Sequence, residues 1–422
     1  MSSRPGDLPI VPTEVVDQRT VGLWQPDSPM SDEDFVGAGH HLFDGSFCWP
    51  AMVLRRSAVE HNIATLSDFC SRHGLAFAPH GKTTMSPALF SKQLDAGAWG
   101  ITVATANQLL AAWSFGLDQV LLANELVDPP RLAWVARELQ VNPDRRILFY
   151  VDSLAGVEIA DAAIRDQVTT RRVPVLLEVG HSGGRTGARD RDSVFAVARA
   201  VAESPVLELA GVAAYEGGLH ELADVESYLG QLQQDIVLLA RDGLLGANPI
   251  VTAGGSAWFD VIAKILGGTW SNGLEPLVVL RSGAYISHDD GIYSTKTPFN
   301  RISAEGSLIA ALEVWAQVTS RSEPSLAIVA MGKREVPYDE GLPVTRAIRR
   351  RGSERLEGLP RIQIAATNDH HAYLPVPEDV EISVGDLICF GVSHPCTAFD
   401  KWRAIALLED DDSVSGVVRT YF

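Results

Sequence analysis

A lone lysine, Lys82, stands among small residues where an apolar run ends. The run at 75–78 breaks at Pro79, and the letters HGKTT follow it. An ammonium group at the carboxyl end of a buried strand is costly unless it has a chemical task. The commonest task for such a lysine is a Schiff base with a carbonyl cofactor or substrate. The alternative is an ordinary solvated lysine at a strand end.

A second candidate centre lies near the other end of the chain, where one residue separates His394 from Cys396. On an extended strand these two side chains would point to the same side, so an imidazole and a thiolate could share one ion. Such a pair suits Zn²⁺ better than Mg²⁺ or Ca²⁺, and two protein ligands leave positions open for water and substrate. The alternative is two unrelated core residues.

The stretches PHGKT, which contains Lys82, and SHPCTAFDKW, which contains His394 and Cys396, resemble two motifs of the alanine-racemase-fold (fold type III) pyridoxal-phosphate enzymes. The resemblance is closest to the branch with D-threonine aldolase and the zinc-dependent D-serine dehydratases, and it covers most of the chain after about Ser46. It implies that Lys82 holds pyridoxal 5'-phosphate and, once displaced, acts as a base. It also implies D-amino acid substrates and a metal, Zn²⁺ or another divalent ion, on His394 and Cys396.

Gly254, Gly255 and Ser256 follow an apolar run and precede a helix-like stretch. Glycine lets a backbone approach a phosphate closely, and a serine can cap both a helix and an anion. A Gly-Gly-Ser sequence by itself is more often a plain turn. Its position resembles the phosphate loop of the family, which implies that these three residues bind the cofactor.

Arg281 begins a stretch, RSGAY, that resembles the Arg-x-Gly sequence at the end of the last barrel strand in the family. The resemblance implies that Arg281 faces the pyridine nitrogen of the cofactor. A guanidinium disfavours protonation of that nitrogen, so the cofactor would be a weaker electron sink. The alternative is a surface arginine. Tyr285, in the same stretch, is a weaker candidate for phosphate binding.

Arg185 lies in a stretch, EVGHSGGRTG, that is longer between its first glycine and its arginine than the family pattern Asp-Val-Gly-x-x-Arg-x-Gly. The resemblance implies that Arg185 lies near the phenolic oxygen of the cofactor, although the extra length leaves its placement open. Tyr215 would pack near the cofactor ring, or else simply in the core. Glu216 and Gly217 follow where relatives often have His-Gly.

Three further residues are weaker candidates. His371 aligns best with a histidine of the relatives and would contact substrate or metal-bound water, unless it is an ordinary exposed loop residue. Thr84, next to the lysine motif, is a candidate substrate contact. Asp400 is expected to orient His394.

These residues must be positioned by regular elements, and the first two thirds of the chain alternates strand-like with helix-like runs. Eight short runs rich in Val, Leu, Ile and Ala read as parallel strands buried on both faces. Eight such units predict a (β/α)8 barrel, which the resemblance also implies. The alternative, an open doubly wound sheet, lacks a GxGxxG fingerprint after the first strand. The predicted strands are 75–78, 100–104, 119–123, 147–151, 173–179, 207–215, 250–253 and 277–280, and the helical stretches include 87–96, 106–115, 130–140 and 221–240.

After about residue 297 the pattern changes to strands with few helices between them, which predicts a β-rich C-terminal domain. The charged segment 335–359 reads as an exposed loop. We therefore expect an N-terminal segment 1–50 that packs with the β domain, a cofactor-binding barrel over 51–296 and a β domain with the metal site over 297–422. The predicted strands of the β domain are 308–320, 325–331, 361–366, 387–392 and 413–421.

Composition limits the classes of protein that fit. The 422 residues, 46% hydrophobic and 21% charged, suit a two-domain globular enzyme. The formal net charge of −18 argues against binding nucleic acid or acidic membranes. No apolar run is long enough to span a membrane, and the first residues lack the apolar core of a secretory signal. Four cysteines in a chain of this size do not predict a disulfide framework, so a reducing cytoplasm is expected.

Together with the resemblance, the sequence thus predicts a lyase that acts on 3-hydroxy D-amino acids. This enzyme would depend on pyridoxal phosphate and a metal. The favoured reaction is D-serine dehydratase-type deamination to a keto acid and ammonia, because some aldolase relatives have aspartate where Cys396 stands. The alternative is D-threonine aldolase-type cleavage to glycine and an aldehyde. A more distant alternative is a non-catalytic pyridoxal-phosphate-binding protein. The resemblance also implies a homodimer.

Overall fold

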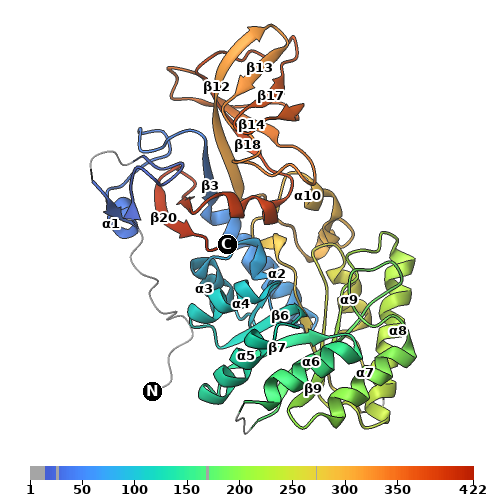
Figure 1. Cartoon of the computed structure of the whole chain (residues 1–422). Coiled ribbons are helices and arrows are strands. Elements are labelled where there is room, and N and C mark those ends of the chain that lie inside the picture. Colours follow the sequence, from blue (N-terminus) through green and yellow to red (C-terminus); the bar gives the residue numbers. More distant parts are fainter. Residues whose placement is uncertain (1–14, 25–27, 168–170, 272) are drawn as a thin grey trace. The chain divides into compact units, whose positions relative to one another are not determined.

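The computed structural model describes residues 15–24, 28–167, 171–271 and 273–422 (Figure 1). The chain divides into two compact units. Among the described residues, unit 1 contains 66–82 and 93–283, and unit 2 contains 15–65, 83–92 and 284–422. Part of the expected N-terminal segment, residues 1–14, lies outside the described residues. The stretch 51–65, expected in the barrel, is part of unit 2.

Unit 1 is built on one sheet of eight parallel strands in the order β4-β11-β10-β9-β8-β7-β6-β5. A parallel bridge between His80 and Thr102 also joins the two ends of this order, β4 and β5. The predicted barrel is therefore confirmed. The strands are β4 (Ala76–Phe77), β5 (Ile101–Val103), β6 (Gln119–Glu125), β7 (Arg146–Val151), β8 (Val173–Val179), β9 (Leu207–Ala214), β10 (Ile250–Ala253) and β11 (Leu277–Leu280).

The connecting helices lie outside the strands, as Figure 1 shows for α5 to α8. Several start at a side chain that accepts a backbone N–H, such as Thr105 before α4, Ser153 before α6 and Asp190 before α7. Their apolar faces are buried against the sheet. The helices of unit 1 are α4 (Ala106–Ser114), α5 (Pro129–Val141), α6 (Leu154–Arg165), α7 (Arg191–Glu203), α8 (Leu222–Arg241) and α9 (Phe259–Ile265), while α2 (Arg56–Arg72) and α3 (Pro87–Asp95) contain residues of both units.

The inside of the barrel is a packed core rather than a channel. One residue from each of several strands contributes to it, including Leu121, Leu148, Leu176 and Val279. Tyr150 on β7 is the large polar member of this cluster and is buried. A filled interior leaves chemistry to the ends of the strands, as is usual for this architecture.

Unit 2 is dominated by a sheet with the strand path β15-β14-β18-β12-β13-β17-β16, to which β3, β19 and β20 are also paired. Its pairs are antiparallel except for β19 with β3. The predicted β-rich domain is confirmed. The strands are β3 (Ala51–Arg55), β12 (Leu312–Glu323), β13 (Leu326–Val329), β14 (Val344–Arg349), β15 (Leu356–Gly358), β16 (Ala366–Thr367), β17 (Ala372–Pro375), β18 (Leu387–Gly391), β19 (Ala404–Leu408) and β20 (Val414–Arg419). The remaining elements of unit 2 are β1 (Val15–Val16), β2 (Met30–Ser31), α1 (Asp32–Gly37) and α10 (Ile292–Lys296).

The prediction of an exposed loop over 335–359 is wrong. This segment contains β14 and β15, and β14 pairs with the fully buried β18. Val336 is completely buried, and Glu335 is nearly so. Charged residues misled the prediction because β14 has only part of its surface buried, so arginines occupy its open positions.

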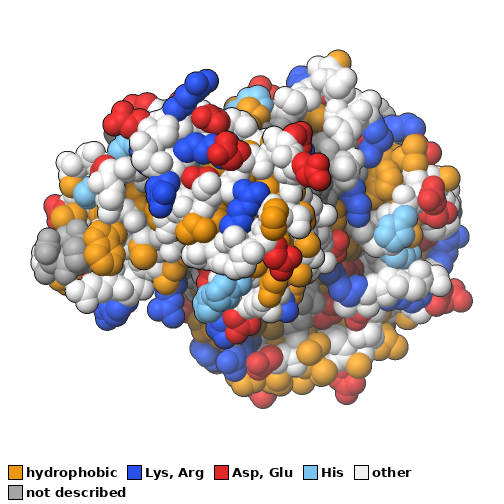
Figure 2. All heavy atoms as spheres, turned by 90° about the horizontal axis from the view of Figure 1, so that it is seen from above, with side chains coloured by type: hydrophobic (Ala, Val, Ile, Leu, Met, Phe, Trp, Pro, Cys, Tyr) orange, Lys and Arg blue, Asp and Glu red, His pale blue; other side chains and the backbone are white. Residues whose placement is uncertain are grey.

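The surface and the cysteines agree with a globular protein. Figure 2 shows Lys, Arg, Asp and Glu side chains interspersed on the face that it presents. Among the described helices, none is both long and apolar enough for a membrane span. All four cysteines are free thiols, as expected from their small number.

Candidate functional site

Lys82 lies in a one-turn 3-10 helix, Gly81–Thr83, directly after the bridge that joins β4 to β5. Its side chain is half-buried. Burial and then the positive charges of Lys82, Arg281 and Arg185 lower the pKa of His80 well below its usual value. Three predicted site residues of unit 1 therefore lie near enough to one imidazole for their charges to act on it. Within the described part of the chain, His80 Nδ1 is buried and has no hydrogen-bond partner.

Arg281 is only 5% exposed, which excludes the surface-arginine alternative. One of its guanidinium nitrogens donates to Thr252 Oγ1 at 2.6 Å, and another donates to the Ala214 carbonyl at 2.7 Å. Thr252 lies on β10, which pairs with β11, and Ala214 ends β9, the next strand beyond β10. Arg281 is thus a fixed cation at the carboxyl end of the barrel strands.

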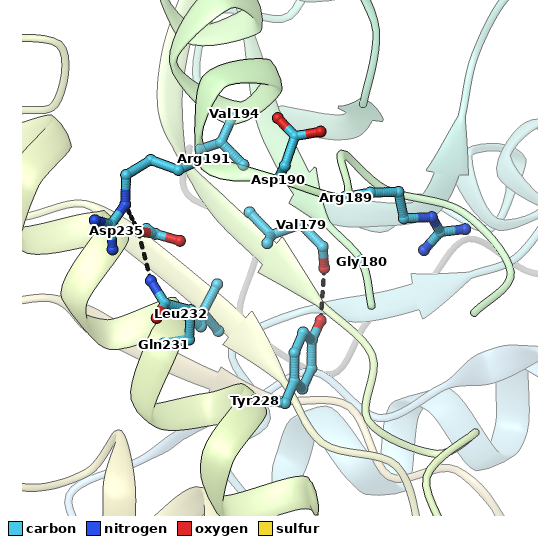
Figure 3. Close-up of a pocket in the computed structure, with 10 residues that line it drawn as sticks. All are labelled: Val179, Gly180, Arg189, Asp190, Arg191, Val194, Tyr228, Gln231, Leu232 and Asp235. Carbon is cyan, nitrogen blue, oxygen red and sulfur yellow. Dashed lines mark hydrogen bonds and ion pairs between the residues drawn. The ribbon is translucent and has the colours of Figure 1, made fainter. Parts of the chain in front are cut away.

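The long stretch before Arg185 forms a closed loop held by Arg189. The guanidinium of Arg189 donates to the carbonyls of His181 at 2.8 Å, Thr186 at 2.8 Å and Gly184 at 2.7 Å. From α8, the hydroxyl of Tyr228 donates to the Val179 carbonyl at 2.6 Å (Figure 3). The loop is therefore anchored at its base and across its middle.

Arg185 stands over the ring of Tyr215, with its guanidinium carbon 5.0 Å from the ring centroid. Tyr215 is 37% exposed, so it is not the simple core residue of the alternative interpretation. Both residues line a cavity of about 120 Å³ at the end of β8, together with Glu178 and the loop glycines. A separate cavity of about 280 Å³ lies between α7 and α8, where Arg191 turns to Asp235 (Figure 3).

Sequence reasoning missed two carboxylates at the same strand ends, Glu125 on β6 and Glu178 on β8. Burial and then a hydrogen bond with Glu178, which stabilises the protonated form of Glu125, raise the pKa of Glu125 to about 8. A hydrogen bond between two carboxyl groups requires a proton between them. In the described part of the chain, Glu178 Oε2 and the nearby Tyr150 hydroxyl are buried without a partner. A charged residue at the end of an apolar strand was the available signal.

The predicted phosphate loop has the expected backbone but not free backbone donors. Gly254 has φ of +94°, and a Cβ there would come within 2.2 Å of Leu280, so glycine is required twice over. The N–H groups of Gly254 and Gly255 donate to the two carboxylate oxygens of Glu216, at 3.0 and 2.8 Å. The helix after this loop starts at Phe259 with Trp258 as its N-cap, so the prediction that Ser256 caps it is wrong.

The metal-ligand candidates His394 and Cys396 are brought together, but not on a strand. His394 precedes a 3-10 helix, Pro395–Thr397, that contains Cys396, so the strand argument for their common side is wrong. Burial alone would lower the pKa of His394, but a hydrogen bond and an electrostatic interaction with Cys396, together with the bond to Asp339, raise it to about 9. The tight turn, rather than an extended strand, brings the side chains of His394 and Cys396 together.

Asp339 orients the imidazole, a role expected of Asp400. Its Oδ2 lies 2.7 Å from His394 Nδ1, and its Oδ1 accepts from Thr397 Oγ1 at 2.8 Å. Burial would raise the pKa of Asp339, but the bonds from Thr397 and His394 lower it. With Nδ1 committed to a carboxylate, Nε2 is the nitrogen available to a metal. Asp339 comes from the charged segment whose strands were also missed.

The thiol has its own neighbour in the lysine motif. Thr83 Oγ1 lies 3.1 Å from Cys396 Sγ, and Thr83 is 99% buried. Thr84, the predicted substrate contact, is also buried. Tyr285 is buried in the 3-10 helix Ala284–Ile286 of unit 2.

His371 is exposed just before β17. The imidazole of the residue before it, His370, is paired with Glu335 at 2.6 Å. Among the described residues, no three His, Cys, Asp or Glu side chains form a metal-ligand group. The contact of His371 with substrate or metal-bound water stays a prediction.

Comparison with known proteins confirms the resemblance drawn from the motifs. Residues 311–408 match the family described as putative serine dehydratase domain. D-threonine aldolase from Arthrobacter sp. is 25% identical over 370 residues, which cover 86% of this chain and 89% of that protein. D-threo-3-hydroxyaspartate dehydratase from Delftia sp. (strain HT23) is 26% identical over 246 residues, 57% of this chain and 61% of that protein.

Solved structures show the same fold. The crystal structure of D-threonine aldolase from Filomicrobium marinum has a TM-score of 0.75 at 23% identity and covers 89% of this chain and 95% of its own. A histidine-to-alanine mutant of D-threo-3-hydroxyaspartate dehydratase has a TM-score of 0.70 at 21% identity, over 92% of this chain and 99% of its own. A cysteine-to-alanine mutant of that dehydratase, in a metal-free form, has a TM-score of 0.67 at 21% identity, over 89% and 98%. The alanine-racemase-like fold is therefore established for this chain.

The residues present fit both groups that the fold suggests. For pyridoxal phosphate, the strand ends of unit 1 offer an amine, two arginines and buried polar atoms that lack a partner in the described part of the chain. For a metal, an imidazole oriented by a carboxylate and a thiol in contact with it form a nitrogen–sulfur donor set. Zn²⁺ is the ion that most often accepts such ligands.

Proposed function

We propose that this protein is a lyase for 3-hydroxy D-amino acids, dependent on pyridoxal phosphate and a divalent metal, and that it deaminates them to a 2-keto acid and ammonia. Held covalently by the Lys82 amine, pyridoxal phosphate would supply an electron sink for charge that develops at the substrate α-carbon. A metal on His394 and Cys396, best Zn²⁺, would make the β-hydroxyl a better leaving group. The favoured substrates are D-serine and its 3-hydroxy relatives.

The residues of this chain have distinct tasks in that reaction. Lys82, once its amine is released, takes the α-proton of the substrate. Arg281, buried and bonded to Thr252 and the Ala214 carbonyl, presents a fixed positive charge that disfavours protonation of the pyridine nitrogen. Loss of the α-proton and the β-hydroxyl leaves an enamine, which water hydrolyses to the keto acid and ammonia.

The observation that carries the proposal is the tight turn that holds His394 and Cys396, with Asp339 bonded to the imidazole at 2.7 Å and Thr83 3.1 Å from the thiol. The histidine and cysteine mutated in the solved dehydratase structures are two positions apart in that protein, as His394 and Cys396 are here. One of those structures is a metal-free form of the cysteine mutant. The cysteine therefore favours dehydration.

Aldol cleavage to glycine and an aldehyde is the second candidate. D-threonine aldolase from Arthrobacter sp. matches 86% of this chain, a longer stretch than the dehydratase matches. The two reactions share the same substrate hydroxyl and differ in whether the carbon–oxygen or the carbon–carbon bond breaks. Only product analysis separates them.

The test incubates purified protein and pyridoxal phosphate with D-serine, D-threonine or D-threo-3-hydroxyaspartate, with and without EDTA. Keto acid and glycine are assayed separately. We expect keto acid that is lost on chelation and restored by zinc. Formation of glycine and an aldehyde would replace dehydration with aldol cleavage. If neither keto acid nor glycine formed, the lyase assignment would be overturned. A homodimer in the cytoplasm completes the proposal, and analytical ultracentrifugation tests the dimer.

A further inference from the structure

Glu216 is a buried carboxylate at the predicted phosphate loop that none of the tasks above uses. It is 0% exposed and directly follows Tyr215 beyond the end of β9. A fully buried acidic side chain is costly unless its oxygens are bonded, so its partners indicate its role.

Those partners are the two consecutive backbone N–H groups that glycine loops usually offer to a phosphate. Gly254 N–H reaches Glu216 Oε2 at 3.0 Å, and Gly255 N–H reaches Oε1 at 2.8 Å. On its other side the same loop is held by the Ser282 hydroxyl, which donates to the Gly255 carbonyl at 2.8 Å. The Gly254–Gly255 backbone is thus fixed by a side-chain anion and a side-chain hydroxyl.

We propose that Glu216 is a positioning residue that sets the phosphate loop, so that the cofactor phosphate is bound by Ser256 and groups beyond it rather than by the Gly254 and Gly255 amides. The inference rests on the proposed function. A carboxylate can accept both N–H bonds with one oxygen each, so one side chain fixes two successive peptide groups of the loop.

The bonds themselves favour an anchor over a competitor for phosphate. Both carboxylate oxygens are engaged, and the side chain has no exposed surface from which it could swing away at low cost. A Cβ at Gly255 would lie 3.3 Å from Tyr215 and 3.8 Å from Glu216 Oε1, so the loop is packed closely on this residue pair. Removing the carboxylate leaves two buried N–H groups without acceptors and frees the loop.

The experiment measures cofactor binding rather than turnover. Cofactor-free wild type, Glu216→Gln and Glu216→Ala are titrated with pyridoxal phosphate and, separately, with pyridoxal, which has no phosphate. Binding is followed by the visible absorbance of the bound carbonyl compound. Glu221→Gln is the matched control. Glu221 is an exposed residue at the start of α8, and its side chain forms no capping hydrogen bond with that helix.

We expect the Kd for pyridoxal phosphate to rise about tenfold in Glu216→Gln and further in Glu216→Ala, with pyridoxal affinity changed by less than about twofold. Retained pyridoxal binding also shows that the variants are folded. Tighter phosphate binding in either variant would make Glu216 a competitor and overturn the proposal. An equal loss for pyridoxal, or no loss for either compound, would overturn it too. A wild-type protein that binds neither compound would instead remove the proposed function on which the inference rests.

Discussion

The ends of the barrel strands in unit 1 and the His394–Cys396 turn in unit 2 handle buried polar atoms in opposite ways. In the described part of the barrel, the Tyr150 hydroxyl, Glu178 Oε2 and His80 Nδ1 are buried without a partner. Around the turn, Asp339 engages His394, and Thr83 lies against Cys396. Buried groups without partners cost stability, so their presence at one site indicates an external ligand.

The difference suggests two kinds of preparation for chemistry. The buried polar atoms at the barrel strand ends that lack a partner in the described part of the chain can form hydrogen bonds with a bound molecule. The turn fixes the direction of two ligand atoms in advance, which favours a small ion with strict geometry. If this comparison is correct, changes at the two sites should separate cofactor binding from metal binding.

Lys82→Ala should have the largest effect and should act on the cofactor alone. Loss of the only amine predicted to hold the cofactor covalently should lower kcat by about 10³-fold or more. The visible absorbance of the bound cofactor should disappear, while the zinc content measured by atomic absorption stays the same. Lys92→Ala is the matched control, since Lys92 pairs with Glu60 on the surface. Loss of zinc together with the cofactor would show that the two sites do not bind their ligands independently.

Cys396→Ala should produce the reverse result. Removing the thiol leaves one protein ligand of the predicted pair, so the expected loss of keto-acid formation is about 10²-fold, and zinc should no longer copurify. The visible absorbance of the bound cofactor should remain. Cys48→Ala, a change at an exposed cysteine, provides the control. Full activity of Cys396→Ala in the presence of EDTA would contradict the metal role.

The barrel could be predicted from the sequence because its signals are local. Strands β8, β10 and β11 have the bounds expected from their apolar runs, since a strand buried on both faces reads as an unbroken run. Lys82 and Arg281 then follow from their places at strand ends. Glu216 could be singled out only as a departure from a pattern, because its partners lie 38 and 39 positions later.

The surroundings of the turn could not be predicted in this way. Asp339 bonds to a histidine 55 positions away, and its own neighbours in sequence give no sign of it. The sequence instead favoured Asp400 because it belongs to the same motif as His394. Strand β14 was missed for a related reason, since a partly exposed strand carries charges that resemble a loop. Antiparallel sheets join distant segments, so local pattern is a poor guide to their contacts.

Asp339→Asn sharpens the assignment of the orienting carboxylate. Loss of the carboxylate charge that is bonded to His394 Nδ1 should weaken zinc binding by about 10- to 100-fold. The visible absorbance of the cofactor should not change. Asp400→Asn is the informative control, because Asp400 is the residue that the sequence favours for the same role. Competition with a zinc-sensitive dye measures both affinities. A larger effect for Asp400→Asn would return the role to that residue.

Glu125→Gln should have the smallest effect. It tests whether Glu125 and Glu178, at the ends of the barrel strands, share a proton. Burial and then the Glu178 hydrogen bond raise the pKa of Glu125 from 4.5 to about 8, with Asp152 adding to the shift. Between these values the unfolded chain releases a proton that the folded chain keeps, so wild-type stability falls as pH rises from about 4.5 to about 8. The amide cannot titrate and should remove this slope.

Urea unfolding of the cofactor-free protein at pH 5 and pH 8 measures the effect. The free energy of unfolding of Glu125→Gln relative to wild type should be higher at pH 8 than at pH 5, by about 1 kcal/mol once solvent screening of this partly exposed residue is allowed for. Glu158→Gln, at an exposed position of helix α6, controls for general changes in charge. An equal difference at both pH values would mean that Glu125 and Glu178 do not share a proton. A shared proton between Glu125 and Glu178 would then not explain why Glu178 Oε2 and the Tyr150 hydroxyl lack a partner in the described part of the chain.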